Sequence, residues 1–180
     1  MTADVDTIAR NALQWAEEHL GSTDYTTRCL AFVEDAVERA NNIEIFGGDY
    51  ASESARLYGA AGSSDPPPLG AFVFFRSVGV IQGVRRDWGH VGLSMGDGRI
   101  IHAWDRVRID DLSSLPALTP AAGWDALSAT GWTPLSRVLD GSRPASWATD
   151  AAAAAVEQQR HVLAGHREAA TSGPTEMIDP

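Results

Sequence analysis

The residues of this chain that could perform covalent chemistry are one cysteine and a pair of histidines. Cys29 is the only cysteine of the 180 residues, and His90 and His102 lie twelve positions apart on either side of a Gly-Asp-Gly sequence at 96–98. A thiolate is a nucleophile, and a neighbouring imidazole can act as a general base when a third polar group orients the ring. These residue types therefore allow nucleophilic catalysis by a cysteine.

Whether the two histidines meet depends on the register of a hairpin predicted around the Gly-Asp-Gly sequence. A three-residue loop with Gly98 in the left-handed conformation pairs Gly92 with His102. His90 and His102 are then diagonal neighbours on one face of the sheet, and Gly92 leaves space between them. A two-residue turn shifts the pairing by one residue and puts the imidazoles on opposite faces. The alternative to a catalytic role is that His90 is a strand-end histidine at the surface and His102 a hydrogen-bonded core residue.

A helix is predicted to position Cys29. Apolar residues recur at helical spacing from Cys29 to Ala40, which predicts a helix with Thr26 or Thr27 as its N-cap. In the first turn, the helix dipole and a nearby imidazolium would lower the thiol pKa from about 8.5 to between about 3.5 and 7.5. The alternative is that Cys29 is only a small buried hydrophobic residue on the inner stripe of this helix.

The remaining elements predict an α+β fold with an antiparallel sheet. Apolar spacing predicts a helix over residues 7–20, which ends at Gly21, and a short third helix over 50–58. The SSDPPPLG segment is a loop, because its three prolines exclude a helix and a central strand. The predicted strands are 71–75, a continuous apolar run, 90–95 and 99–104, which form a hairpin, and 106–110, where apolar and charged residues alternate. Helices followed by a run of strands are typical of α+β domains.

We expect one domain over residues 1–145. In the last part of this domain, 112–143, apolar residues recur without a clear period. We expect this part to consist of packed loops, with room for one further strand. The segment 146–180 is expected to contain an alanine-rich helix over 150–170 and a disordered tail from 171.

Composition limits the partners that this chain can bind. It carries 24 carboxylates against 14 arginines and no lysine, which gives a formal net charge of −10. This field repels polyanions, so neither nucleic acid nor an anionic membrane is an expected partner. The sequence shows neither a secretory signal nor an apolar run near the roughly 20 residues of a membrane span. We therefore expect a cytoplasmic protein, with export by another route as the alternative.

No cofactor is expected, and metal binding is a minor alternative. Cys29, His90 and His102 are residue types that bind zinc, but they lack the short paired spacing that structural zinc sites show.

These residues, in this order, resemble the NlpC-type cysteine peptidases, a papain-like family. The resemblance is carried by Cys29 on its helix, by PPLGAFVFF at 67–75 and by GHVGLSMGDGRIIHA at 89–103. The last segment matches the His-Val-Gly, glycine-turn and His-Ala pattern of the family. The resemblance covers roughly residues 9–104.

The resemblance implies a papain-like α+β core in which the nucleophile helix packs on an antiparallel sheet. It implies that Cys29 is the nucleophile, that His90 is the general base and acid, and that His102 fixes the tautomer of His90. Asp105 and Asp110 are rivals of His102 as the orienting group.

The chain departs from the family pattern around the cysteine. Where the family reads Asp-Cys-Ser-Gly, this chain reads Arg-Cys-Leu-Ala at 28–31, so the acidic and hydroxyl groups that commonly hold the substrate amine are missing. Tyr25 could replace the family tyrosine as an oxyanion or substrate contact. Arg28 could bind a substrate carboxylate or could point into solvent.

Further side chains are candidates for the walls of a cleft. Trp88 and Trp104 flank the predicted site, although aromatic residues at strand ends are commonly structural. Arg85 and Arg86 could bind an acidic substrate group in a bidentate manner, or form a solvated loop face.

The resemblance implies a cysteine hydrolase that cleaves an amide bond through a thioester. The implied substrate is a small peptide, such as a muropeptide cleaved beside a γ-D-glutamyl residue of the cell wall. The alternatives are an amidase of the CHAP type or an acyltransferase on the same fold, and a pseudo-enzyme that binds peptides without cleaving them.

Overall fold

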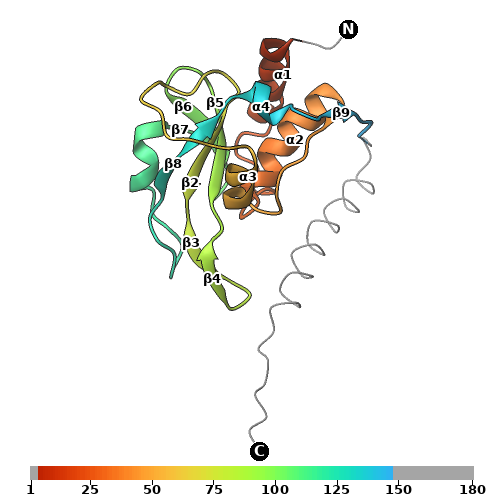
Figure 1. Cartoon of the computed structure of the whole chain (residues 1–180). Coiled ribbons are helices and arrows are strands. Elements are labelled where there is room, and N and C mark those ends of the chain that lie inside the picture. Colours follow the sequence, from red (N-terminus) through yellow and green to blue (C-terminus); the bar gives the residue numbers. More distant parts are fainter. Residues whose placement is uncertain (1–3, 148–180) are drawn as a thin grey trace, which may run out of the picture. The chain divides into compact units, whose positions relative to one another are not determined.

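The computed structural model describes residues 4–147, and residues up to Ser146 belong to one compact unit (Figure 1). Its helices are α1 (Val5–Glu18), α2 (Cys29–Asn41), α3 (Ala51–Leu57), α4 (Leu135–Val138) and the 3-10 helix η1 (Leu112–Ala117). Its strands are β1 (Ile43–Glu44), β2 (Phe72–Arg76), β3 (Val78–Ile81), β4 (Val84–Asp87), β5 (His90–Ser94), β6 (Arg99–Ala103), β7 (Val107–Asp111), β8 (Ser128–Thr133) and β9 (Arg143–Pro144).

Five strands form one antiparallel sheet in the order β7-β6-β5-β2-β8. Two small antiparallel pairs accompany it, β1 with β9 and β3 with β4, and the β3–β4 pair extends beyond the end of the sheet (Figure 1). The helices precede most of the strands along the chain. The α+β fold with an antiparallel sheet is therefore confirmed.

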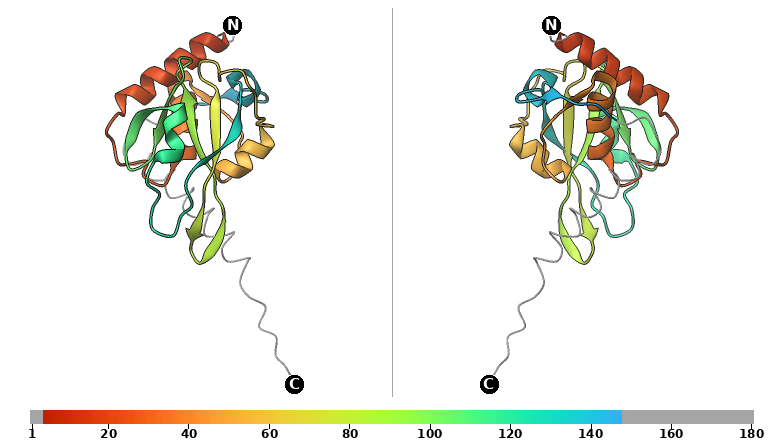
Figure 2. Two further views of the ribbon diagram at one scale, coloured as in Figure 1. Left: turned by 90° about the vertical axis from the view of Figure 1, so that its left-hand side faces the viewer. Right: turned by 90° about the vertical axis from the view of Figure 1, so that its right-hand side faces the viewer.

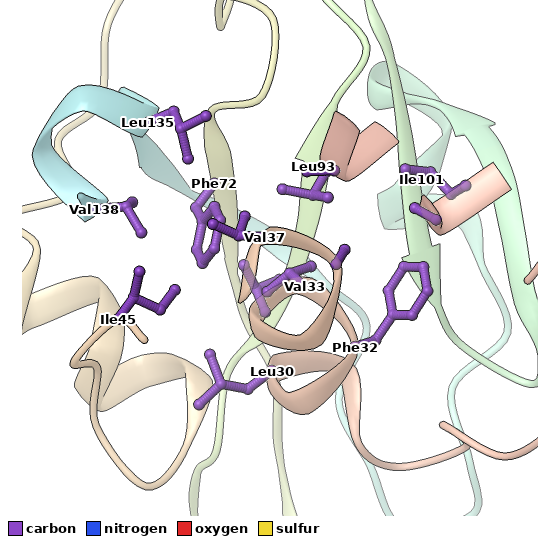
Figure 3. Close-up of a cluster of buried hydrophobic side chains, with 14 of the residues drawn as sticks. Leu30, Phe32, Val33, Val37, Ile45, Phe72, Leu93, Ile101, Leu135 and Val138 are labelled. Carbon is purple, nitrogen blue, oxygen red and sulfur yellow. The ribbon is translucent and has the colours of Figure 1, made fainter. Parts of the chain in front are cut away.

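Both faces of the sheet are covered, which explains why β2 is apolar at every buried position. Two views from opposite sides show α2 over one face and η1 over the other (Figure 2). Phe72, Leu93 and Ile101 pack against Val33 and Val37 of α2 (Figure 3). The alternate residues of the same strands pack under η1, and this second cluster consists of Val73, Phe75, Ile100, Leu115 and Leu127.

The β5–β6 hairpin has the register that places the two histidines on one face. Gly92 pairs with His102, and the connecting glycines Gly96 and Gly98 have φ angles of 78° and 91°. A Cβ at position 92 would lie 2.9 Å from the His102 Cβ and 2.9 Å from the Ile100 Cδ1. The prediction of a three-residue loop, with Gly92 leaving space beside His102, is therefore confirmed.

Two predicted details are wrong, and two small strand pairs were not predicted. The cap of α2 is Arg28 and not a threonine: Thr27 has a φ of 64°, and the Thr26 hydroxyl donates to the Thr23 and Asp105 carbonyls. The helix predicted over 7–20 is α1 and starts at Val5, because Asp4 accepts hydrogen bonds from the amides of its first turn. The unpredicted pairs are β3 with β4 and β1 with β9.

Several expectations concern residues at the C-terminal end of the chain. The strand expected within 112–143 is β8, which joins the sheet beside β2. The helix expected at 150–170 and the tail from 171 lie outside the described residues, and the domain boundary at residue 145 stays a prediction. Within the described part of the chain, no helix combines the length and apolar character needed to cross a membrane.

Candidate active site

His90, His102 and Asp110 form a hydrogen-bonded series across three neighbouring strands. The His90 Nε2 lies 2.8 Å from the His102 Nδ1, and the His102 Nε2 lies 2.9 Å from the Asp110 Oδ2. Both rings are buried, with 3% and 0% of their residue surface exposed. The residues predicted to be diagonal neighbours therefore touch, and a carboxylate lies behind them.

Arg108 holds the carboxylate that ends this series. Its Nε lies 2.6 Å from the Asp110 Oδ2, and a terminal nitrogen donates to the Oδ1 at 2.9 Å. Burial raises the pKa of Asp110, but hydrogen bonds from Arg108 and His102 outweigh it, so the pKa lies below its ordinary value. Of the two aspartates considered from the sequence, Asp110 contacts His102, whereas Asp105 pairs with Arg108 and Arg106.

The ionised carboxylate determines where the protons of the two rings reside. Because Asp110 can only accept, the His102 Nε2 carries a proton and its Nδ1 offers a lone pair. The His90 Nε2 then donates to that lone pair, which leaves the His90 Nδ1 as the basic nitrogen. Burial lowers the pKa of His90 well below its ordinary value, and it also lowers that of His102. Both rings are consequently neutral at pH 7.

Cys29 is the first residue of α2 and is half-buried beside β5, on which α2 packs. The backbone N–H groups of Val91, Leu30 and Cys29 itself act on the sulfur. Val91 follows His90 directly, so the sulfur lies at the end of β5 where the histidine series begins.

The prediction that the pKa of the Cys29 thiol is lowered is wrong for the free protein. Burial raises the pKa of Cys29 to about 11, and the negative charge of Glu34 adds to the increase. The three backbone N–H groups lower the pKa, but by less than burial raises it. The resting cysteine is therefore a thiol and not a thiolate at neutral pH.

Tyr25 and Arg28, the candidate substrate contacts before Cys29, interact with each other and with α2. The Tyr25 hydroxyl donates to the Asp35 carboxylate at 2.6 Å, and its ring packs edge-on against Phe32. The Arg28 guanidinium lies 5.8 Å from the centre of the Tyr25 ring. The Tyr25 hydroxyl thus already has a partner within the protein.

The two tryptophans have different contacts around His90. The Trp104 ring lies 5.2 Å from the His90 ring in an edge-on arrangement. Trp88 donates through its Nε1 to the Gly79 carbonyl, and its own carbonyl accepts from the Ser52 amide of α3. Trp104 therefore contacts the histidine series directly, whereas Trp88 anchors the segment that leads into it.

The two arginines before β5 have different surroundings. Arg85 donates to Asp125 at 2.9 Å and to the Gly123 carbonyl, so it is held by the loop before β8. Arg86 lies over the rings of Tyr50 and Trp88 and donates to the Tyr50 hydroxyl.

Two residues that shape the site escaped the sequence analysis. The Asp87 carboxylate accepts from the amides of Ser77 and Gly89, each at 2.9 Å, and so fixes the turn into His90. Arg108 binds the Asp110 carboxylate. The alternation of arginine and aspartate along 106–110 was the sequence signal that could have revealed this contact. Among residues 4–147, no group of three or more histidine, cysteine, aspartate or glutamate residues could hold a metal ion.

Comparisons with solved structures concern the fold of this chain. A solved structure of NlpC1 from Trichomonas vaginalis has a TM-score of 0.51 with this chain at 17% identity, over 72% of this chain and 44% of that protein. An NlpC/P60 family protein from Bacillus cereus has a TM-score of 0.42 at 19% identity, over 71% of this chain and 40% of its own. The chain thus spans less than half the length of these two proteins.

No curated protein matches the chain. The sequence pattern of the NlpC/P60 family matches residues 18–119, which include Cys29, His90, His102 and Asp110. The structure has the papain-like α+β fold that is expected for a chain with this pattern. The match extends over more than half of the 180 residues, and the chain belongs to the NlpC/P60 family, whose members are generally cysteine peptidases or amidases.

Proposed function

We propose that this protein is a cysteine hydrolase that cleaves an amide bond of a small peptide, with Cys29 as the nucleophile. The observation that carries the proposal is the buried series His90–His102–Asp110, which starts at the end of the strand whose amide acts on the Cys29 sulfur. A neutral imidazole with an assigned basic nitrogen at this place is what a thiol needs for activation.

The first half of the reaction forms a thioester. The His90 Nδ1 takes the thiol proton while the sulfur attacks the amide carbon, because the resting thiol is protonated. The backbone N–H of Cys29, at the start of α2, stabilises the oxyanion that develops. The His90 imidazolium then gives its proton to the leaving amine, and the C–N bond breaks.

The second half returns the enzyme to its resting state. His90 accepts a proton from water as the water oxygen attacks the thioester carbon. The carbon–sulfur bond breaks, the carboxylic acid product leaves, and the thiolate regains the proton from His90. His102 and Asp110 keep the His90 ring in one orientation throughout.

Within this reaction, a cell-wall type peptide cleaved beside a γ-D-glutamyl residue is the proposed substrate. Membership of the NlpC/P60 family supports it. One observation favours a second candidate, a pseudo-enzyme that binds peptides only, namely the high pKa of the Cys29 thiol.

The test is a comparison of the wild type with Cys29→Ala and His90→Gln on a pool of soluble muropeptides. New termini are identified by mass spectrometry, with and without added amine or alcohol acceptors. We expect fragments from the wild type alone and hydrolysis in preference to transfer. Binding of the peptides without any cleavage would establish the pseudo-enzyme, and products that carry the acceptor would establish an acyltransferase.

A further inference from the structure

Arg85 and Arg86 are neighbours on β4, but only Arg85 has a carboxylate partner. Arg85 pairs with Asp125 at 2.9 Å. Arg86 forms no ion pair with any residue between 4 and 147, although the chain contains 24 aspartates and glutamates. The carboxylate of Asp87, the next residue, accepts hydrogen bonds from two backbone amides instead. The Arg86 guanidinium is therefore a charge that no carboxylate of the described residues pairs with.

Two aromatic rings hold the Arg86 guanidinium in place. Its central carbon lies 4.3 Å from the centre of the Tyr50 ring and 5.0 Å from that of the Trp88 ring, and these rings meet edge-on at 5.6 Å. One guanidinium N–H donates to the Tyr50 hydroxyl. Trp88 is itself fixed, because its Nε1 donates to the Gly79 carbonyl at 3.1 Å. A guanidinium that is already oriented loses less conformational freedom when it binds a ligand.

Most N–H donors of Arg86 remain open to solvent. Arg86 is exposed, and a guanidinium has five N–H donors in a planar fork, of which Tyr50 takes one. Two parallel donors of such a fork match the two oxygens of a carboxylate. The ligand would approach from the solvent side, so this contact needs no cavity. The ligand chemistry that fits the guanidinium is therefore a carboxylate.

Arg86 lies at the end of the sheet that carries Cys29 and His90. Phe75, near the end of β2, pairs with His90, and the β3–β4 pair continues the chain from that end of the sheet (Figure 1). Arg86 precedes His90 by four residues, which span at most about 14 Å. An extended peptide rises about 3.3 Å per residue. A substrate whose scissile amide lies at Cys29 can therefore reach Arg86 with a group a few residues away.

We propose that Arg86, held against the rings of Tyr50 and Trp88, binds a carboxylate of the substrate, so that the enzyme prefers peptides with an acidic group a few residues from the bond that is cleaved. The structure separates Arg86 from Arg85, whose guanidinium is already paired. The inference rests on the proposed function, because it takes Cys29 as the position of the scissile bond.

The experiment measures alkylation of Cys29 by matched peptides and needs no known substrate. The probes are iodoacetyl peptides with a spacer of zero to four glycines and a terminal aspartate amide or asparagine amide. Rates are measured at 0.15 M salt, where the field of the whole chain is screened, and are corrected with those of free cysteine. At the best spacer length, we expect the aspartate probe to react about threefold to fivefold faster than the asparagine probe, as for a well-oriented ion pair at an exposed position.

The source of the carboxylate is tested with a third series of probes. These probes end in asparagine with a free carboxyl group in place of the amide. A gain in this series, at a different spacer length, would show that a terminal carboxylate binds as well as a side-chain carboxylate, and a gain in the aspartate series alone would assign the preference to an acidic side chain.

Three variants assign the ratio of the two rates to Arg86. Arg86→Gln should bring the ratio to one or below. Arg85→Gln is the matched control, because it removes the same charge from the adjacent exposed position and should leave the ratio as in the wild type. Arg86→Lys keeps the charge but not the planar fork, so it should lower the ratio in part. Circular dichroism of each variant identifies any that does not fold.

The outcomes separate this inference from the proposed function. A wild-type ratio of one or below at every spacer length, or a ratio that Arg86→Gln and Arg85→Gln lower equally, overturns the carboxylate site whatever the activity. An unchanged ratio in Arg86→Lys overturns the bidentate contact. A ratio that is lost only when Arg86 is replaced supports the site, even if the peptide assay finds no cleavage and the proposed function fails.

Discussion

At the scale of single residues, Asp110 decides which nitrogen of the site is basic. It accepts from the His102 Nε2, and this hydrogen bond fixes the direction of the next one, from His90 to His102. Arg108 contacts both oxygens of the carboxylate and keeps it ionised. The pair Arg108–Asp110 therefore acts on the nucleophile only through two imidazoles.

This role predicts a large effect of Asp110→Asn. An amide N–H of the asparagine can donate to the His102 Nε2, which reverses both hydrogen bonds and places a proton on the His90 Nδ1. We expect kcat/KM to fall about 100-fold or more, the size of a lost general base. Nitrogen NMR of the two rings should show the reversed tautomers. Asp105→Asn is the control, because the Asp105 carboxylate pairs with Arg106 and Arg108 and not with His102; equal losses in both variants would contradict the role of Asp110.

The thiol of Cys29 gives a second prediction at this scale. Its pKa is raised to about 11, so the fraction of thiolate keeps increasing above pH 9, where free cysteine is already ionised. The rate of alkylation by iodoacetamide should accordingly rise up to about pH 11 without a plateau near neutrality. Glu34→Gln removes one cause of the increase and should move the midpoint to lower pH. A plateau near pH 7 would instead reveal a thiolate–imidazolium pair.

The same shift has a consequence for stability, with a definite sign. The folded protein holds the Cys29 proton more tightly than the unfolded chain, so the unfolded chain ionises first as the pH rises. The free energy of unfolding should therefore decrease between about pH 9 and 11 by an amount that is absent in Cys29→Ala, as urea titrations of both proteins would measure. Equal slopes with pH in both proteins would show that the pKa of the thiol is not raised.

At the scale of elements, the β5–β6 hairpin brings the histidines together, and Gly92 is its critical position. A Cβ there would lie 2.9 Å from the His102 Cβ and 3.1 Å from the Ile101 carbonyl oxygen, which is backbone and cannot yield easily. Gly92→Ala should lower the free energy of unfolding by about 1–3 kcal/mol, as overpacking does, and should lower activity as well. Gly62→Ala is the control, since its nearest contact would be 3.9 Å; equal stability of both variants would be inconsistent with crowding at Gly92.

The secondary-structure elements show which features of the fold and the site could be predicted from the sequence and which could not. Alternation and the glycine turn limited the β5–β6 register to two alternatives, because these signals are local, and the structure shows the one with the three-residue loop. The sequence was not sufficient to choose Asp110 over Asp105 as the partner of His102, since this contact depends on the pairing of β6 with β7. The β3–β4 pair was missed because its pattern is weak: Gly79 interrupts β3, where Trp124 packs so closely that a Cβ would clash. The thiol pKa was predicted wrongly because burial depends on the whole packing around a residue.

At the scale of the whole molecule, the net charge of −10 should attract cations and repel anions near the site. This long-range field is screened by salt, with a Debye length of about 30 Å at 0.01 M and about 8 Å at 0.15 M. A contact between two charges at a partly buried position acts over a few ångströms and is screened much less. Salt should separate the two contributions.

The last prediction uses this separation. For the wild type, we expect iodoacetate to alkylate Cys29 more slowly than neutral iodoacetamide at 0.01 M salt, and this deficit, corrected with free cysteine, should shrink at 0.3 M. If the deficit is the same at 0.01 M and 0.3 M, it comes from a group close to Cys29 and not from the total charge of the chain.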